Sequence, residues 1–148
     1  AFLGEYTEYK TFFHGHTYTG NPLACAAGIA SLEIFEKDGV LDSLPGKANL
    51  LDKELQEQVS PLSHVADIRQ KGLMVGIELA ATKTDPQPYD ARRRIGKRVI
   101  EHARTLGVIL RPLGDVIVLL PPLSISEEDL VRLVEATRSS IQEVTERA

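Results

Sequence analysis

Apolar residues recur at helical spacing in four stretches of the chain. This spacing predicts helices over residues 21–37, 41–59, 90–106 and from 126 to near the C-terminus. Asn21 followed by Pro22 is typical of a helix start, since asparagine caps a helix and proline fits its first position. Gly39 and Gly107 stand just after the expected ends of the first and third helices, where glycine commonly ends a helix.

Short apolar runs between these helices predict strands. The expected strands cover residues 64–70, 73–79, 108–111 and 116–120. Lys71-Gly72 separates the first two, and Pro112-Leu113-Gly114-Asp115 separates the last two with the composition of a turn. Strands joined by short turns and segregated from helices predict an α+β domain with a largely antiparallel sheet and its helices on one side.

Length and composition indicate how many domains the chain forms and which kinds of partner it is expected to lack. The 148 residues suit one domain, and a net charge of −4 with 26% charged residues predicts no nucleic-acid or membrane partner. No signal peptide opens the chain. The lone cysteine, Cys25, excludes an internal disulfide, fits a cytoplasmic location, and is expected to be buried among helix alanines. The chain begins at Ala1 and its only methionine is Met74, so we expect a piece of a longer protein.

The loop before the first predicted helix is the strongest candidate for binding chemistry. Gly15, Thr17, Thr19 and Gly20 offer backbone N–H groups and hydroxyls that suit a phosphate-like anion. The same composition is also typical of a polar loop that only caps a helix. The residues alone leave both interpretations open.

Two other kinds of site are not predicted at this loop. His14 and His16 are one residue apart, but metal sites usually need three or more ligands, and the other histidines lie far away. Asn21 and Pro22 stand where a Walker phosphate loop needs Lys and Ser or Thr, so a nucleotide triphosphatase is excluded.

Three segments together resemble the class III (fold type I) pyridoxal-phosphate aminotransferases. They are HGHTYTGNPLACAA at residues 14–27, RQKGLMVGIEL at residues 69–79 and GVILRPLGDVI at residues 107–117. The resemblance covers almost the whole chain but only the C-terminal part of such an enzyme. It implies the small C-terminal domain of a fold type I enzyme over residues 21–148, after an irregular lead-in and phosphate-contact loop at residues 1–20.

The resemblance implies binding roles for four residues. His16 and Thr17 would bind pyridoxal 5'-phosphate, with Thr17 reaching across a homodimer interface to the cofactor phosphate in the neighbouring subunit. Many members carry proline where His16 stands, so a backbone contact is expected there rather than a side-chain role. Gly15 and Arg111 would bind the substrate.

The Arg-Pro-Leu-Gly run narrows the resemblance to the biotin-pathway branch of the family. Arg111 would there pair with the carboxylate of a long keto-acid substrate, which a planar guanidinium can grip with two hydrogen bonds. The alternative is a surface ion pair at a strand end. A tyrosine familiar in that branch corresponds to Val118 here. The implied activity is amino transfer from S-adenosylmethionine to 8-amino-7-oxononanoate in biotin biosynthesis.

The groups that carry the chemistry in this family lie upstream of residue 14. They are the Schiff-base lysine and a carboxylate beside the pyridine nitrogen, and Lys10 is too close to the motif to be that lysine. We therefore expect no catalytic residue in this chain, no activity of the chain alone, and a missing N-terminal large domain as its partner. Two alternatives stay open: another class III enzyme acting on ω-amino acids, or a non-enzymatic dimerisation or binding module.

Overall fold

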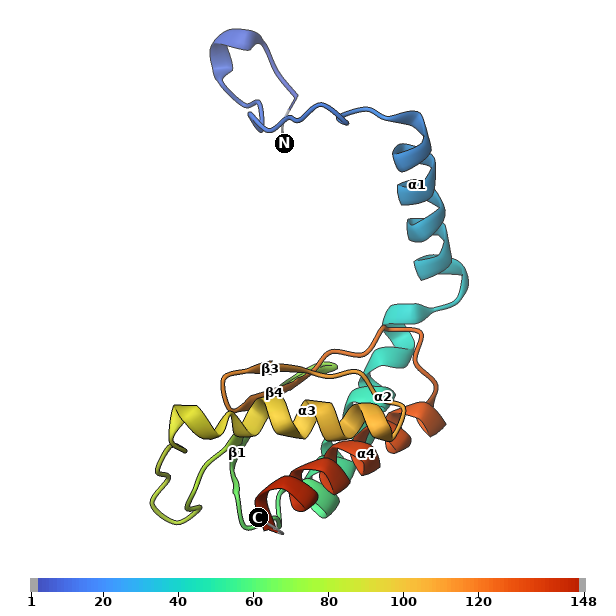
Figure 1. Ribbon diagram of the computed structural model, residues 1–148. Coiled ribbons are helices and arrows are strands. Elements are labelled where there is room, and N and C mark those ends of the chain that lie inside the picture. The colour runs from blue at the N-terminus through green and yellow to red at the C-terminus, as the bar shows by residue number, and fades with distance from the viewer. Residues whose placement is uncertain (1–2, 147–148) are drawn as a thin grey trace. The chain divides into compact units, whose positions relative to one another are not determined.

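The computed structural model describes residues 3–146 and falls into two compact units (Figure 1). The first unit ends at Asp38 and the second begins at Gly39, so each is described by itself. Residues 1–2 and 147–148, at the outer ends of the predicted lead-in (1–20) and the predicted C-terminal domain (21–148), lie outside the described part of the chain. Within that part, every helix is too short or too polar to cross a bilayer.

The first unit is a lead-in followed by one helix. A short 3₁₀ helix (Tyr6–Glu8) precedes an irregular segment, and α1 (Pro22–Lys37) follows. The Asn21 side chain accepts a hydrogen bond from the Ala24 N–H at 3.0 Å, which confirms the predicted cap. None of the α1 residues, all of which the structure describes, is buried. The predicted burial of Cys25 is therefore wrong here: the side chain is exposed, because the apolar face of α1 packs on nothing within its unit.

The second unit is a four-stranded antiparallel sheet with helices on one side. Its elements are α2 (Val40–Glu54) with a π-helical turn (Leu55–Val59), β1 (Val65–Lys71), β2 (Met74–Leu79), α3 (Ile95–Thr105), β3 (Arg111–Leu113), β4 (Val116–Leu119) and α4 (Glu127–Glu146). The strand order is β1-β2-β4-β3, with every pair antiparallel. The predicted α+β fold is confirmed.

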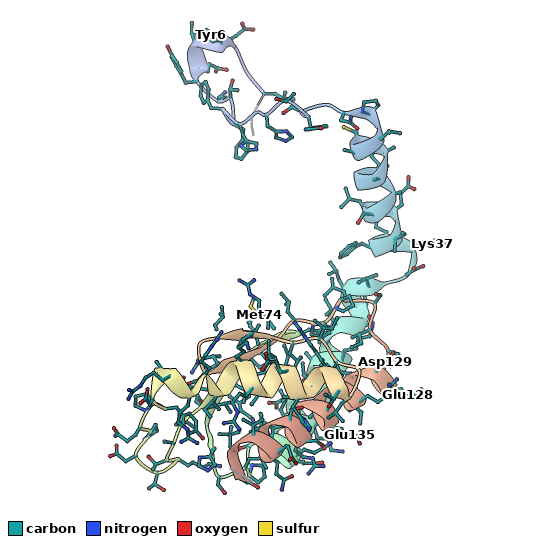
Figure 2. The ribbon with its side chains drawn as sticks, viewed as in Figure 1. Tyr6, Lys37, Met74, Glu128, Asp129 and Glu135 are labelled. Carbon is teal, nitrogen blue, oxygen red and sulfur yellow. The ribbon has the colours of Figure 1, made fainter. Side chains whose placement is uncertain are left out.

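Alternation along the central strands explains why the helices cover one face only. Every second residue of β2 and β4 is buried in the same core as the apolar residues of α2, α3 and α4: Val75, Ile77, Leu79, Ile117 and Leu119. The residues between them face the other way, and Met74 lies on the side of the sheet opposite the helices (Figure 2). On that open face Arg69 Nη1 donates to Asp67 at 2.7 Å and to Glu78 at 2.6 Å, joining β1 to β2.

The predicted helix 90–106 and the predicted strand 108–111 differ most from the structure. The helix expected from residue 90 is a 3₁₀ turn (Ala91–Arg93) followed by α3, because Arg94 adopts a left-handed conformation with φ 49° that interrupts the helix. The strand expected at residues 108–111 instead begins at Arg111 and includes Pro112. Pro112 is tolerated because β3 is an edge strand, where a residue without an N–H leaves no ladder position empty.

A cap at the start of α4 gives a first testable prediction. Asp129, in the first turn of this helix (Figure 2), donates its N–H to Ser126 Oγ at 3.0 Å. Replacing Ser126 with alanine should lower the free energy of unfolding by about 1 kcal/mol, because that N–H loses its acceptor. Urea denaturation followed by circular dichroism measures the change. Ser139→Ala, inside the same helix, is the control, and an equal loss in both variants would contradict the role of the cap.

Candidate functional site

The loop before α1 closes on itself around His16. The His16 N–H donates to Thr19 Oγ1 at 2.9 Å, and the Thr19 N–H donates to the His16 carbonyl at 3.0 Å. The Tyr18 N–H donates to His16 Nδ1 at 3.1 Å, so a neutral ring carries its proton on Nε2. His16 therefore orders the turn through groups that are already paired.

Thr17 lies in this turn, and its hydroxyl and backbone N–H are available to bind a ligand. Among residues 3–146, neither its hydroxyl nor its N–H makes a hydrogen bond, and the residue is exposed. Gly15 lies in open space, where even an added Cβ would meet no atom within 4 Å. Two adjacent unpaired donors fit a phosphate oxygen, to which hydrogen bonds are stronger than to a neutral acceptor. The described residues contain no cluster of three or more His, Cys, Asp or Glu placed to hold a metal ion.

Arg111 opens β3 at the edge of the sheet. It pairs in register with Val118 of β4 and is exposed. Within the described part of the chain its guanidinium makes no ion pair, so the alternative of a surface ion pair is not what the structure shows.

A groove of about 740 Å³ lies beside Arg111. Its walls come from the segment before β3, from β4 and the residues after it, and from α4, and they are mostly apolar. Ile109 is 84% exposed and Leu120 is 68% exposed, and both line this groove. Asp129 and Arg132, which also line it, form an ion pair at 3.1 Å. An apolar groove with a free guanidinium suits a ligand that has a hydrocarbon chain and a carboxylate.

The turn between β3 and β4 is held from two sides by Asp115, a residue that the sequence reasoning treated only as part of a turn. Asp115 Oδ1 accepts from the Gly96 N–H at 2.9 Å, and its carbonyl accepts from the Leu79 N–H at 3.1 Å. The residue before α3, Arg94, supplies no side-chain cap. Ser, Thr, Asp or Asn commonly precedes a helix and caps it, and none of them stands directly before α3. This absence in the sequence could have indicated that the cap of α3 comes from a distant residue.

Tyr89 is buried close to the same turn. Burial is the main cause that raises the pKa of its hydroxyl; the Asp115 carboxylate raises this pKa further, while Arg93 lowers it. The Arg93 guanidinium carbon lies 5.3 Å from the centre of the Tyr89 ring, within the range of a cation–π contact. Tyr89 therefore remains neutral near physiological pH and packs as an aromatic side chain.

The predicted site residues thus form two groups. Gly15, His16 and Thr17 share one loop of the first unit, and Arg111 stands in the second unit beside the groove. The structure describes each group within its own unit.

Comparison with known proteins gives consistent matches. A family model described as aminotransferase class-III matches residues 3–141. The chain is 51% identical over 145 residues to the adenosylmethionine-8-amino-7-oxononanoate aminotransferase of Geobacter sulfurreducens, covering 98% of this chain and 32% of that protein. The chain spans about a third of the length of the curated relatives that it matches.

Solved structures match in the same way. The crystal structure of the adenosylmethionine-8-amino-7-oxononanoate aminotransferase from Methanocaldococcus jannaschii matches with a TM-score of 0.85 and 46% identity, over 97% of this chain and 32% of that one. An amine transaminase from an uncultivated Pseudomonas species, in its PLP-bound form, matches with a TM-score of 0.81 and 33% identity, over 90% of this chain and 30% of that one.

Proposed function

We propose that this chain, which belongs to the class III aminotransferase family, is the C-terminal part of an enzyme of biotin biosynthesis. The enzyme transfers an amino group from S-adenosylmethionine to 8-amino-7-oxononanoate, the reaction partners named in its relatives. The single observation that carries the proposal is the Arg111 guanidinium at an apolar groove, which has no ion-pair partner among the described residues. The keto acid has the two features that such a groove suits, a hydrocarbon chain and a carboxylate.

The cofactor of the proposed enzyme is pyridoxal 5'-phosphate, which supplies the electron sink for amino-group transfer. Thr17 fits its phosphate, because the hydroxyl and N–H are both unpaired among the described residues. His16 supports this contact by closing the turn that presents Thr17. A direct contact of His16 with the cofactor stays a prediction.

The substrate contacts in the proposal come from Arg111 and Gly15. The guanidinium grips the carboxylate with two hydrogen bonds and so fixes the far end of a flexible chain. Val118 lies opposite Arg111 in register and offers methyl groups rather than a hydroxyl, so the guanidinium is the polar contact on this pair of strands. The open space at Gly15 lets substrate approach the backbone of the loop.

The proposed enzyme is a homodimer in which Thr17 serves the site of the neighbouring subunit. In the first unit Tyr18 is 74% exposed and Leu23 80% exposed, and large apolar surface of this kind is usually covered by protein. In the proposal, this apolar surface is covered by the partner subunit and by the N-terminal large domain. That domain also holds the Schiff-base lysine and the carboxylate beside the pyridine nitrogen of the cofactor. Residues 21–148 then form the C-terminal domain.

Thr17 gives a second testable prediction, on the full-length enzyme. Thr17→Ala should weaken cofactor binding about tenfold or more, because a hydrogen bond to a charged group contributes about 1.5–3 kcal/mol. Thr17→Ser keeps the hydroxyl and should bind nearly as the unmodified protein does. Titration of the apoenzyme, followed by cofactor absorbance, measures the affinity. Thr11→Ala is the control, and equal affinities of the Thr17→Ala and Thr11→Ala variants would contradict the assignment.

The amino donor tests the proposed reaction. The full-length protein should convert 8-amino-7-oxononanoate to the diamine with S-adenosylmethionine and not with glutamate, as followed by mass spectrometry. Turnover with glutamate instead would favour an ω-amino-acid aminotransferase. Turnover with neither donor would favour a binding module. The 148-residue chain alone should be inactive in every case.

A further inference from the structure

We propose that Asp115 is the positioning residue for Arg111, acting through the β3–β4 turn rather than by touching substrate. The inference rests on the proposed function, because it assigns a role toward the arginine that binds the substrate carboxylate. Its physical basis is the way the short strand that carries Arg111 is held in the fold.

The strand that carries Arg111 is short and pairs with one neighbouring strand. β3 is three residues long (Arg111–Leu113) and lies at the edge of the sheet, so β4 is its sole strand neighbour. Pro112, in its middle, has no N–H to donate. Leu110, directly before Arg111, is buried in the core and holds one end of the strand, so the other end depends on what fixes the turn three residues away.

That turn is fixed by Asp115, which joins three elements at one point. Its carboxylate accepts from the Gly96 N–H of α3 at 2.9 Å, and its carbonyl accepts from the Leu79 N–H at the end of β2 at 3.1 Å. The carboxylate also lies where a negative charge is favoured, at the N-terminal turn of a helix. Since Arg94 provides no cap of its own, Asp115 is the side chain that satisfies this end of α3.

The contact leaves little freedom for the turn to shift toward α3. Gly96 approaches the Gly114 carbonyl so closely that any Cβ at position 96 would overlap its oxygen. Gly114 itself has φ 61°, a left-handed conformation that glycine adopts at low cost. The turn therefore packs closely against the N-terminus of α3, and the hydrogen bond from the Gly96 N–H to the Asp115 carboxylate holds it there.

Loss of the Asp115 carboxylate should therefore act on substrate binding through Arg111. The turn and the edge strand would move away from α3, and the two-point contact between guanidinium and carboxylate would lose its geometry. A substrate without a carboxylate makes no such contact, so its reaction should not depend on Asp115. This difference separates a positioning role from general destabilisation.

The test uses the full-length enzyme with bound cofactor and the variants Asp115→Ala, Asp115→Asn, Arg111→Ala and the Arg111→Ala/Asp115→Ala double variant. The value of kcat/KM is measured for 8-amino-7-oxononanoate and for its methyl ester, which lacks the carboxylate charge. Asp115→Ala should lower kcat/KM for the acid on the order of ten- to hundredfold, mainly through KM, as expected for a misplaced contact. The value for the ester should not change.

Two controls make the role of the hydrogen bond specific. Asp115→Asn keeps an oxygen that can accept from Gly96 and should recover most of the value for the acid. The double variant should lose no more than Arg111→Ala alone, because the two residues act in series. If Asp115→Ala does not fold, as judged by its thermal melting, Asp115→Glu should show the same selective loss, since its longer side chain displaces the turn.

The outcomes distinguish the inference from the proposed function. An equal loss for acid and ester, or no loss in a folded Asp115→Ala variant while Arg111→Ala is impaired, would overturn the positioning role alone. If Arg111→Ala leaves kcat/KM for the acid unchanged, the proposed carboxylate contact itself fails. A selective loss for the acid, recovered by asparagine, would support both.

Discussion

The Gly96→Ala variant is expected to be strongly destabilised in the second unit. An alanine Cβ would overlap the Gly114 carbonyl oxygen and lie 3.2 Å from the Asp115 Cα, and both atoms belong to backbone that cannot rotate away. Overpacking against backbone should cost about 3 kcal/mol or more, at or beyond the upper end of the usual range for added methyl groups. The expected result is a much lower urea midpoint than that of the unmodified chain.

Gly46→Ala is the matched control for this prediction. Gly46 lies inside α2, is exposed, and has no atom within 4 Å of an added Cβ. Alanine there should raise the free energy of unfolding by about 0.5–1 kcal/mol, because glycine is the poorer helix former. The two glycine-to-alanine changes are thus expected to have opposite signs. Similar midpoints for both variants would mean that the turn does not pack against α3 as described.

Replacing Arg111 with alanine in the full-length enzyme is the second change with a large expected effect. The value of kcat/KM for the keto acid should fall on the order of a hundredfold or more, because truncating one partner of a paired charge costs about 2–5 kcal/mol. Arg111→Lys keeps the charge but not the two-pronged donor geometry, so it should recover only part of the loss. Steady-state kinetics with varied keto acid measures both.

Arg104→Ala serves as the control for the loss of an arginine. Arg104 is exposed on α3 and does not line the groove, so its removal should leave kcat/KM unchanged. If Arg104→Ala and Arg111→Ala reduce kcat/KM equally, the effect comes from net charge and not from a carboxylate contact.

Local signals in the sequence predicted the elements that local interactions determine. The Asn21-Pro22 pair placed the start of α1, and the turn at Lys71-Gly72 placed the antiparallel pairing of β1 with β2. The same local reasoning failed at Arg94, because a left-handed conformation is rare for arginine and carries no sequence signature.

Interactions between distant residues could not be predicted in this way. Asp115 caps a helix that begins well before it in the sequence, so its role becomes visible only when the turn and the helix N-terminus meet. The burial expected for Cys25 presupposed a packing partner for α1, which its unit does not contain.

The candidate site also combines residues that the sequence points to and a groove that only the fold creates. The residue types of the loop around Thr17 suggested only that it could bind an anion. The binding roles of Thr17 and Arg111 were expected from the resemblance to the aminotransferase family, and they stay predictions. The groove beside Arg111 was not predicted, since its walls come from three separate segments that the fold brings together.

The decisive measurement for the role of Arg111 is a crystal structure of the full-length enzyme with bound 8-amino-7-oxononanoate. We expect the substrate carboxylate to accept two hydrogen bonds from the Arg111 guanidinium at about 2.7–2.9 Å, with the hydrocarbon chain against the apolar groove. A substrate carboxylate held by other residues, with Arg111 directed away from it, would rule out this role of Arg111.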